Sequence, residues 1–234
     1  MLEALDKAPG RELWDIGGGT GNYAAALCDR GWRATVVDRS PDMLTAAAAK
    51  GLPTLQADAT ALPIADQTLD GVTMISMLHQ VKDWPAALSE ARRVLRPGGQ
   101  LAVTLLTAEH LREVTWTYWW FPSTTTSALA QRPTLKQLLE QLPGGEAIPL
   151  EIDDLEDASI AALCRFPERI LDPQWRNQTT FFEQLTDHHA SELQDGLERL
   201  RSKLTAGERP DAQCAPARAI YGDATLLTWT RPVH

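Results

Sequence analysis

The sequence predicts an α/β fold built around a mostly parallel sheet. Over residues 10–107, short apolar runs alternate with segments of helical spacing, the pattern of repeated strand–helix–strand units. A glycine-rich stretch, Gly17-Gly18-Gly19-Thr20-Gly21, stands between the first strand and the first helix. The next helix has a clear start at Ser40-Pro41-Asp42, with a serine cap, a proline in the first turn and an acid at the positive helix end.

The elements follow one another in a regular order. Strands are predicted at residues 12–16, 33–38, 54–57, 70–76, 100–106, 146–152 and 224–230. Helices are predicted at 22–30, from 41 to Gly51, at 84–95 and 134–142, and between about 158 and 204. A sharp turn is predicted at residues 96–99, and the polar run 123–126 is typical of a loop. The stretch between the last two strands is too long for a hairpin, which indicates a helical insert, either a lid or a subunit contact.

Size and charge limit the possible functions. The chain has 234 residues, enough for one α/β domain with an added lid. Its formal net charge of −9 argues against a nucleic-acid substrate. The basic clusters, Arg92-Arg93 and the group around Arg199, are expected on solvated helix faces.

Cysteine usage and hydropathy bear on location. The three cysteines, Cys28, Cys164 and Cys214, are widely spaced, so neither a disulfide framework nor a metal site is predicted. A reducing cytoplasm fits this pattern. Residues 1–10 lack a signal-length apolar stretch, and no run approaches the roughly 18 residues of a membrane span.

The glycine turn indicates a site for an adenosine-type cofactor, because backbone without Cβ atoms can approach a ligand closely. Two readings remain open from the turn alone. Residues 19–24 loosely fit the dinucleotide pattern Gly-x-Gly-x-x-Gly/Ala. Residues 15–21 fit Asp-x-Gly-x-Gly-x-Gly in full.

Two acids close the neighbouring strands. Asp38, at the end of the second strand, can accept hydrogen bonds from both ribose hydroxyls and suits NAD or S-adenosylmethionine equally. Asp58-Ala59, after the third strand, could meet the adenine amino group and a ring nitrogen. Dinucleotide-binding folds do not regularly have an acid at this position, so Asp58 favours S-adenosylmethionine as the cofactor. The alternative is that Asp58 is an ordinary solvated turn residue.

Five segments together resemble the class I S-adenosylmethionine-dependent methyltransferases, in the branch of small-molecule and quinone-type methylases. They are Leu-Trp-Asp-Ile-Gly-Gly-Gly-Thr-Gly-Asn-Tyr (13–23), Val-Val-Asp-Arg-Ser-Pro-Asp-Met-Leu (36–44), Gln-Ala-Asp-Ala-Thr-Ala-Leu-Pro (56–63), Leu-Asp-Gly-Val-Thr-Met-Ile-Ser-Met-Leu-His-Gln-Val (69–81) and Arg-Val-Leu-Arg-Pro-Gly-Gly-Gln-Leu (93–101). Their order and spacing are specific together, although no single one is decisive.

The resemblance implies a doubly wound, Rossmann-like sheet of seven strands with the last antiparallel. It implies a cofactor site in which the glycine turn cradles the methionine part and the residues after the fourth strand lie beside the sulfonium. The implied cofactor-binding residues are Asp15, Gly17, Gly18, Gly19, Gly21, Asp38, Arg39, Asp58, Ala59, Ser76 and Met77.

The acceptor side is less defined. Methyl transfer is an in-line displacement, so a base is needed only if the acceptor must lose a proton. His79 is the first candidate, with packing in the pocket wall as the alternative, and His110 is a weaker one. The aromatic residues Trp116, Trp119 and Trp120 either line an acceptor site or simply pack the insert.

These observations predict a single methyltransferase domain over residues 1–234. Its parts are a cofactor-binding core (10–107), an acceptor-side segment (108–157), a helical insert or lid (158–205) and a last strand (223–231). Related proteins commonly carry a helical segment that covers the cofactor, whereas about ten residues precede the first strand here. We expect the insert or a second subunit of a homo-oligomer to take that role, or an open site.

The predicted function is methyl transfer from S-adenosylmethionine to oxygen, nitrogen or carbon of a small molecule, the activity of class EC 2.1.1. One alternative is an enzyme of the same fold with non-methylating chemistry, such as a cyclase. A less favoured alternative is an NAD-dependent oxidoreductase, and a further one is a non-catalytic binding protein.

Overall fold

The structure is a computed structural model that describes residues 2–153 and 159–233. Residues 154–158, where the predicted acceptor-side segment (108–157) meets the predicted insert (158–205), lie outside the described residues. The chain divides into two compact units. Unit 1 comprises Met1–Leu105, Lys136–Ile148 and Leu226–His234, and unit 2 comprises Leu106–Leu135 and Pro149–Thr225.

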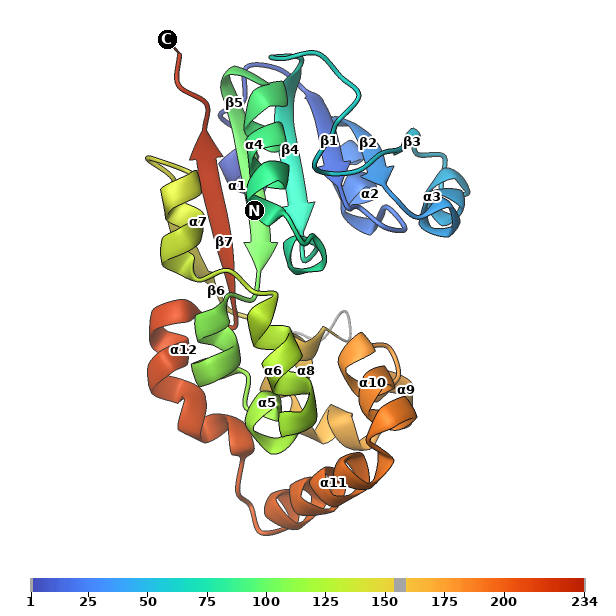
Figure 1. Ribbon diagram of the computed structural model, residues 1–234, viewed down its shortest axis with the longest axis vertical. Coiled ribbons are helices and arrows are strands. Elements are labelled where there is room, and N and C mark those ends of the chain that lie inside the picture. The colour runs from blue at the N-terminus through green and yellow to red at the C-terminus, as the bar shows by residue number, and fades with distance from the viewer. Residues whose placement is uncertain (1, 154–158, 234) are drawn as a thin grey trace. The chain divides into compact units, whose positions relative to one another are not determined.

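A seven-stranded sheet with the order β3-β2-β1-β4-β5-β7-β6 organises the fold (Figure 1). Its first five strands pair in parallel. The strands are β1 (Glu12–Ile16), β2 (Arg33–Asp38), β3 (Thr54–Gln56), β4 (Leu69–Ile75), β5 (Leu95–Leu105), β6 (Glu146–Leu150) and β7 (Ala224–Thr230).

The last strand runs against its neighbour. The amide of Gly98 donates to the Arg231 carbonyl, and the Arg231 amide donates to the Gly99 carbonyl, so the start of β5 lies beside the end of β7. All the helical elements between β6 and β7 form one long insertion. The predicted fold class, with seven strands, a reversed last strand and a helical insert, is therefore confirmed.

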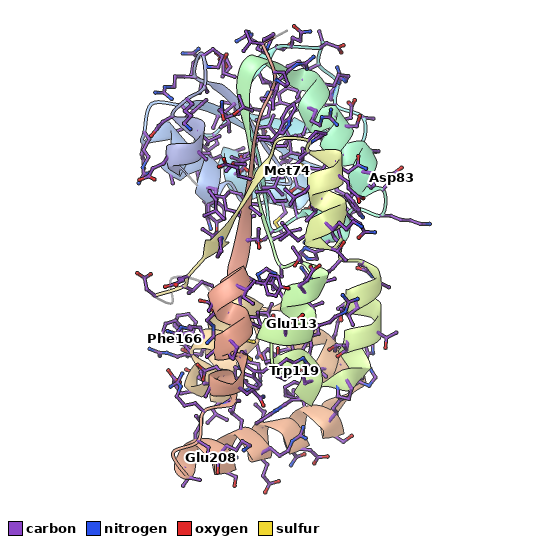
Figure 2. All side chains as sticks on the ribbon, turned by 90° about the vertical axis from the view of Figure 1, so that its left-hand side faces the viewer. Met74, Asp83, Glu113, Trp119, Phe166 and Glu208 are labelled. Atoms are coloured by element: carbon purple, nitrogen blue, oxygen red, sulfur yellow. The ribbon has the colours of Figure 1, made fainter. Side chains whose placement is uncertain are left out.

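Helices of unit 1 cover the sheet. They are α1 (Leu2–Leu5), α2 (Asn22–Cys28), α3 (Pro41–Ala48), α4 (Trp84–Val94) and α7 (Leu135–Gln141), with a 3₁₀ turn η1 (Leu78–Gln80). The Ser40 hydroxyl accepts from the Met43 amide at the start of α3, as the sequence predicts. Asp83 caps α4 by accepting from the Ala86 amide (3.1 Å; Figure 2 labels Asp83).

The central strand β4 is almost wholly buried, which a parallel strand covered on both faces requires. Met74, labelled in Figure 2, has no exposed surface. The turn predicted at residues 96–99 is a bulge inside β5, because Leu69 pairs with Leu95 while Gly71 pairs with Gln100.

Unit 2 is helical and has its own core. Its helical elements are η2 (a π-helical turn, His110–Val114), α5 (Thr117–Trp120), α6 (Pro122–Ala130), α8 (Ile160–Arg165), η3 (Pro167–Leu171), α9 (Pro173–Arg176), α10 (Thr180–His188), α11 (Ala190–Thr205), η4 (Pro210–Cys214) and α12 (Ala215–Tyr221). Phe121, Phe181 and Phe182 meet edge to face in the core, with centroids 4.9–5.9 Å apart.

Two sequence predictions about surfaces are wrong. The polar run 123–126 lies in α6 and not in a loop. Pro122 fits the first helical turn, and the hydroxyl of Thr124 donates back to the Phe121 carbonyl (2.9 Å). Arg92 and Arg93 are also not merely solvated: Arg92 donates to the Gln141 carbonyl (2.8 Å) and stacks over Trp229.

Candidate functional site

The glycine turn in unit 1 is shaped for close approach. Gly17 has a φ of +66°, and a Cβ there would lie 2.7 Å from Met77, so only glycine fits. Gly19 also has a positive φ, but a Cβ there would meet only the Met43 sulfur, at 4.0 Å. The turn is thus packed against the sheet at Gly17 and leaves its backbone accessible at Gly19.

Asp15 lies directly beneath this turn. Its side chain is fully buried, and Oδ1 accepts from the Thr73 hydroxyl at 2.7 Å. Burial raises the pKa of Asp15 to about 6; the charge of Asp38 adds to the rise, and the Thr73 hydrogen bond opposes it. A Cβ on Gly18 would lie 2.6 Å from Oδ2, so the carboxyl is in contact with the turn itself.

The raised pKa of Asp15 predicts a pH-dependent stability. Asp15 binds its proton more tightly in the folded chain than in the unfolded chain. Its contribution to the free energy of unfolding therefore falls as pH rises from about 4 towards 7. The two pKa values correspond to a loss of about 2 kcal/mol over that range. Urea unfolding of wild type and Asp15→Asn at pH 4 and pH 7 checks this, since the variant lacks the titration. An equal pH response in both proteins would contradict it.

Asp38 joins the glycine turn to the start of α3. Its Oδ2 accepts from the Gly19 amide at 3.0 Å, and its Oδ1 accepts from the Ser40 amide at 2.9 Å. Each carboxylate oxygen has two lone pairs, so both can accept a further hydrogen bond from a ligand. Asp38 is therefore held in place by backbone and is still able to bind.

Asp58, Ala59 and Arg39 lie at the ends of β2 and β3. Oδ1 of Asp58 accepts from the Thr60 amide (2.8 Å) and the Thr60 hydroxyl (2.7 Å). These bonds lower the pKa of Asp58, and the bond from the amide has the larger effect. Asp58 is exposed and Ala59 is buried. The positive charge of Arg39 also lowers the pKa of Asp58, as the smallest of these effects.

The end of β4 supplies the remaining residues of unit 1. Ser76 has a φ of +50°, a region that residues other than glycine rarely occupy and that occurs often at functional sites. Its amide donates to the Thr104 carbonyl at 2.9 Å. Met77 packs against the glycine turn, and His79 follows in η1, half-buried. The role of His79 as a base stays a prediction.

The structure therefore gathers all the predicted cofactor residues, and His79, at one edge of unit 1. This edge is formed by the carboxyl ends of β1, β2, β3 and β4, where open α/β sheets bind their ligands. His110, Trp116, Trp119 and Trp120 belong instead to unit 2.

His110 is fixed in the interior of unit 2. Its Nδ1 lies 3.1 Å from the Thr107 amide, which can only donate, so Nδ1 accepts and Nε2 carries the proton. Nε2 then donates to the Tyr221 carbonyl at 3.1 Å. Burial lowers the pKa of His110. This neutral ring with both nitrogens engaged is suited to holding η2 near α12; the acceptor-side role stays a prediction.

The three tryptophans have different environments. Trp116 is fully buried, and its indole N–H donates to the Cys164 carbonyl at 2.9 Å, as the packing alternative expects. Trp120 is covered by Arg199, whose guanidinium lies 5.2 Å from the ring centroid. Trp119, labelled in Figure 2, is 39% exposed. With Trp120 and α11 it lines an open groove of about 680 Å³. Their part in acceptor binding stays a prediction.

Thr73 is a site residue that the sequence analysis missed. It is the only hydroxyl in β4, fully buried, and it orients the Asp15 carboxyl. A hydroxyl residue within the apolar second half of this strand is a signal that could have found it. In the part of the chain that the structure describes, no group of three or more His, Cys, Asp or Glu side chains could hold a metal ion. No described helix has the length and apolar character needed to cross a membrane.

Comparison with known proteins decides between the two cofactor readings of the glycine turn. Residues 14–103 match the methyltransferase domain. Over these residues the chain is similar to the class I S-adenosylmethionine-dependent methyltransferases. This match spans β1 to β5 and includes every residue of the unit 1 edge described above, so the methyltransferase interpretation of Asp15 and the glycine turn replaces the dinucleotide one.

Curated relatives that match this part of the chain are named for quinone methylation. A demethylmenaquinone methyltransferase of Mycolicibacterium paratuberculosis is 42% identical over 100 residues, 43% of this chain and 44% of that protein. The ubiquinone/menaquinone biosynthesis C-methyltransferase of Paracoccus denitrificans is 38% identical over 128 residues, 50% of this chain and 51% of its own length. The chain thus spans about half the length of the curated relatives it matches.

A solved structure shares the fold over nearly the whole chain. It is a protein from Anabaena variabilis named as a methyltransferase from an antibiotic biosynthesis pathway. The TM-score is 0.75 and the identity 24%, covering 98% of this chain and 95% of that chain. At this identity the likeness supports the fold, unit 2 included, and no further conclusion.

Proposed function

We propose that this protein transfers the methyl group of S-adenosylmethionine to a small-molecule acceptor. The observation that carries the proposal is the convergence of the glycine turn, Asp38 and Asp58-Ala59 at one edge of unit 1. The accessible backbone at Gly19, beside the anchored Asp38, fits the cofactor because a Cβ at that glycine would meet no atom closer than 4.0 Å.

Each residue of this edge has a proposed task. The turn at residues 17–21 holds the methionine part of the cofactor, and Asp38 accepts from the ribose hydroxyls. Asp58 and Ala59 bind the adenine edge, with Arg39 beside them. Ser76 and Met77 lie against the reacting end. When bound, S-adenosylmethionine supplies an already activated methyl group, so the protein contributes chiefly alignment.

His79 is the proposed base for acceptors that must lose a proton. Its position in η1, two residues after Met77, supports this role, because we propose that the reacting group lies at that strand end. For an acceptor that loses no proton, His79 only shapes the pocket wall. A replacement such as His79→Asn then separates these cases, because it slows transfer to a hydroxyl acceptor and leaves cofactor affinity unchanged.

The acceptor is proposed as a class only. The relatives are named for quinone substrates, and we propose a small molecule methylated on oxygen, nitrogen or carbon. We assign cofactor binding to residues 10–107 and the acceptor to the segments 108–157 and 158–205, within a single methyltransferase domain. The net charge of −9 supports a non-nucleic-acid substrate, and the spacing of the cysteines supports a cytoplasmic location. A homo-oligomer also stays a prediction.

Mass spectrometry tests the activity. The protein is incubated with S-adenosylmethionine and a panel of quinols, phenols and amines, and both products are followed. We expect release of S-adenosylhomocysteine together with an acceptor that gains one methyl group. Consumption of S-adenosylmethionine with no methylated acceptor would favour the non-methylating alternative instead.

A further inference from the structure

Arg93 of α4 makes an unusually dense set of contacts for a helix-surface residue. Its guanidinium donates to the carbonyls of Leu62 (3.0 Å) and Ile64 (2.8 Å) and to the carboxylate of Asp66 (2.8 Å). It also donates from Nε and Nη2 to Glu90, one turn earlier on the same helix, at 2.7 and 2.8 Å. All these bonds lie within unit 1.

Glu90 completes the connection. Its Oε2 accepts from the Leu62 amide at 2.8 Å, so both backbone groups of Leu62 are held by the Glu90–Arg93 pair. The side chain of Leu62 is buried as well. The hydrogen bond from Arg93 lowers the pKa of Glu90, which keeps this carboxylate ionised and accepting.

The segment held in this way begins at the proposed adenine contact. Leu62 lies three residues after Ala59, and the Ala61 amide donates to the Asp58 carbonyl at 3.0 Å. Asp58 itself is exposed, and its carboxylate accepts from the amide and the hydroxyl of Thr60. The position of residues 58–61 therefore depends on where Leu62 is fixed.

We infer that Arg93, acting with Glu90, is a positioning residue for cofactor binding: it fixes the segment 58–66 so that Asp58 and Ala59 are set at the adenine end of the site. This inference rests on the proposed function. Arg93 does not touch the cofactor in this account, and its effect passes through Leu62 to Asp58. If Arg93 only stabilised the fold, replacing it would change cofactor affinity no more than replacing another arginine that anchors α4.

Arg231 provides the matched control. It donates from Nη1 to three carbonyls at the end of the same helix, those of Arg92, Arg93 and Leu95. None of the hydrogen bonds that Arg231 makes with described residues reaches the segment 58–66. Arg93→Met and Arg231→Met thus each remove several hydrogen bonds from α4, but only the first releases the adenine-end segment.

The test is calorimetric titration of the full chain with S-adenosylhomocysteine at 15 °C, after circular dichroism shows each variant folded. We expect Arg93→Met to raise the dissociation constant about tenfold and Arg231→Met to raise it less than twofold. In an Asp58→Ala background, Arg93→Met should raise the dissociation constant by a further factor of less than three. The Asp58 contact that Arg93 positions is already lost in that background. If Arg93→Met does not fold, Arg93→Lys and Glu90→Gln take its place, with a smaller rise expected.

The outcomes separate the two claims. No binding of S-adenosylhomocysteine to the wild-type chain would overturn the proposed function. Normal wild-type binding with equal effects of Arg93→Met and Arg231→Met would overturn the positioning role and leave the proposed function standing. Full additivity with Asp58→Ala would also overturn it, because Arg93 would then act on affinity by another route.

Discussion

Replacing Asp38 with alanine will weaken the binding of S-adenosylhomocysteine about 100-fold. In the proposed site this carboxylate accepts hydrogen bonds from both ribose hydroxyls. Bonds to a charged acceptor contribute roughly 1.5 kcal/mol each, and about 3 kcal/mol corresponds to that factor. The Gly19 and Ser40 amides already hold the carboxylate, so little ordering cost opposes binding.

Asp42→Ala is the matched control for this prediction. Asp42 is an exposed acid in the first turn of α3, a few residues from Asp38. Its loss should change the affinity less than twofold in the same titration. Unfolding curves of both variants show whether the loss of the Asp38 backbone contacts affects the fold. An Asp38→Ala protein that binds like wild type would remove Asp38 from the site.

Replacing Trp116 with alanine will lower the free energy of unfolding by about 4 kcal/mol, the cost of a large aromatic deletion in a core. The side chain is fully buried in unit 2, and its removal also leaves the Cys164 carbonyl without the indole N–H that it accepts. Trp119→Ala, three residues further along, should cost less than about 1 kcal/mol because its side chain is 39% exposed.

Urea unfolding of the two tryptophan variants in parallel measures this difference. The same proteins then address the acceptor prediction. If Trp119 contacts the acceptor, Trp119→Ala raises the KM for that acceptor at unchanged stability, and Trp116→Ala acts through stability. A Trp116→Ala protein as stable as wild type would contradict the packing role described here.

Local signals predicted much of unit 1. The bounds of β1, β2 and β7 agree with the sequence prediction, because apolar alternation and flanking glycines mark them clearly. The start of α3 was predictable because Ser40 and Pro41 act through neighbours in the chain. The clustering of Asp15, Asp38 and Asp58 at one edge followed from the parallel arrangement of their strands.

The features that sequence analysis missed depend on distant partners. Arg93 looked like a solvated helix residue because its partners, Leu62 and Ile64, contribute backbone carbonyls that no sequence pattern announces. Residues 123–126 looked like a loop since threonine and serine favour turns. In the structure the Thr124 hydroxyl donates to the Phe121 carbonyl, just before α6, and the Thr125 hydroxyl donates to the Tyr118 carbonyl in α5. The Nε2–H of His110 donates to the Tyr221 carbonyl, 111 residues away, a partner that no local pattern indicates.

Calorimetric titration of the full chain identifies its cofactor, with S-adenosylhomocysteine in one experiment and NAD⁺ in another. We expect one molecule of S-adenosylhomocysteine bound per chain and no heat of binding with NAD⁺. Binding of NAD⁺ in the absence of any binding of S-adenosylhomocysteine would contradict this expectation.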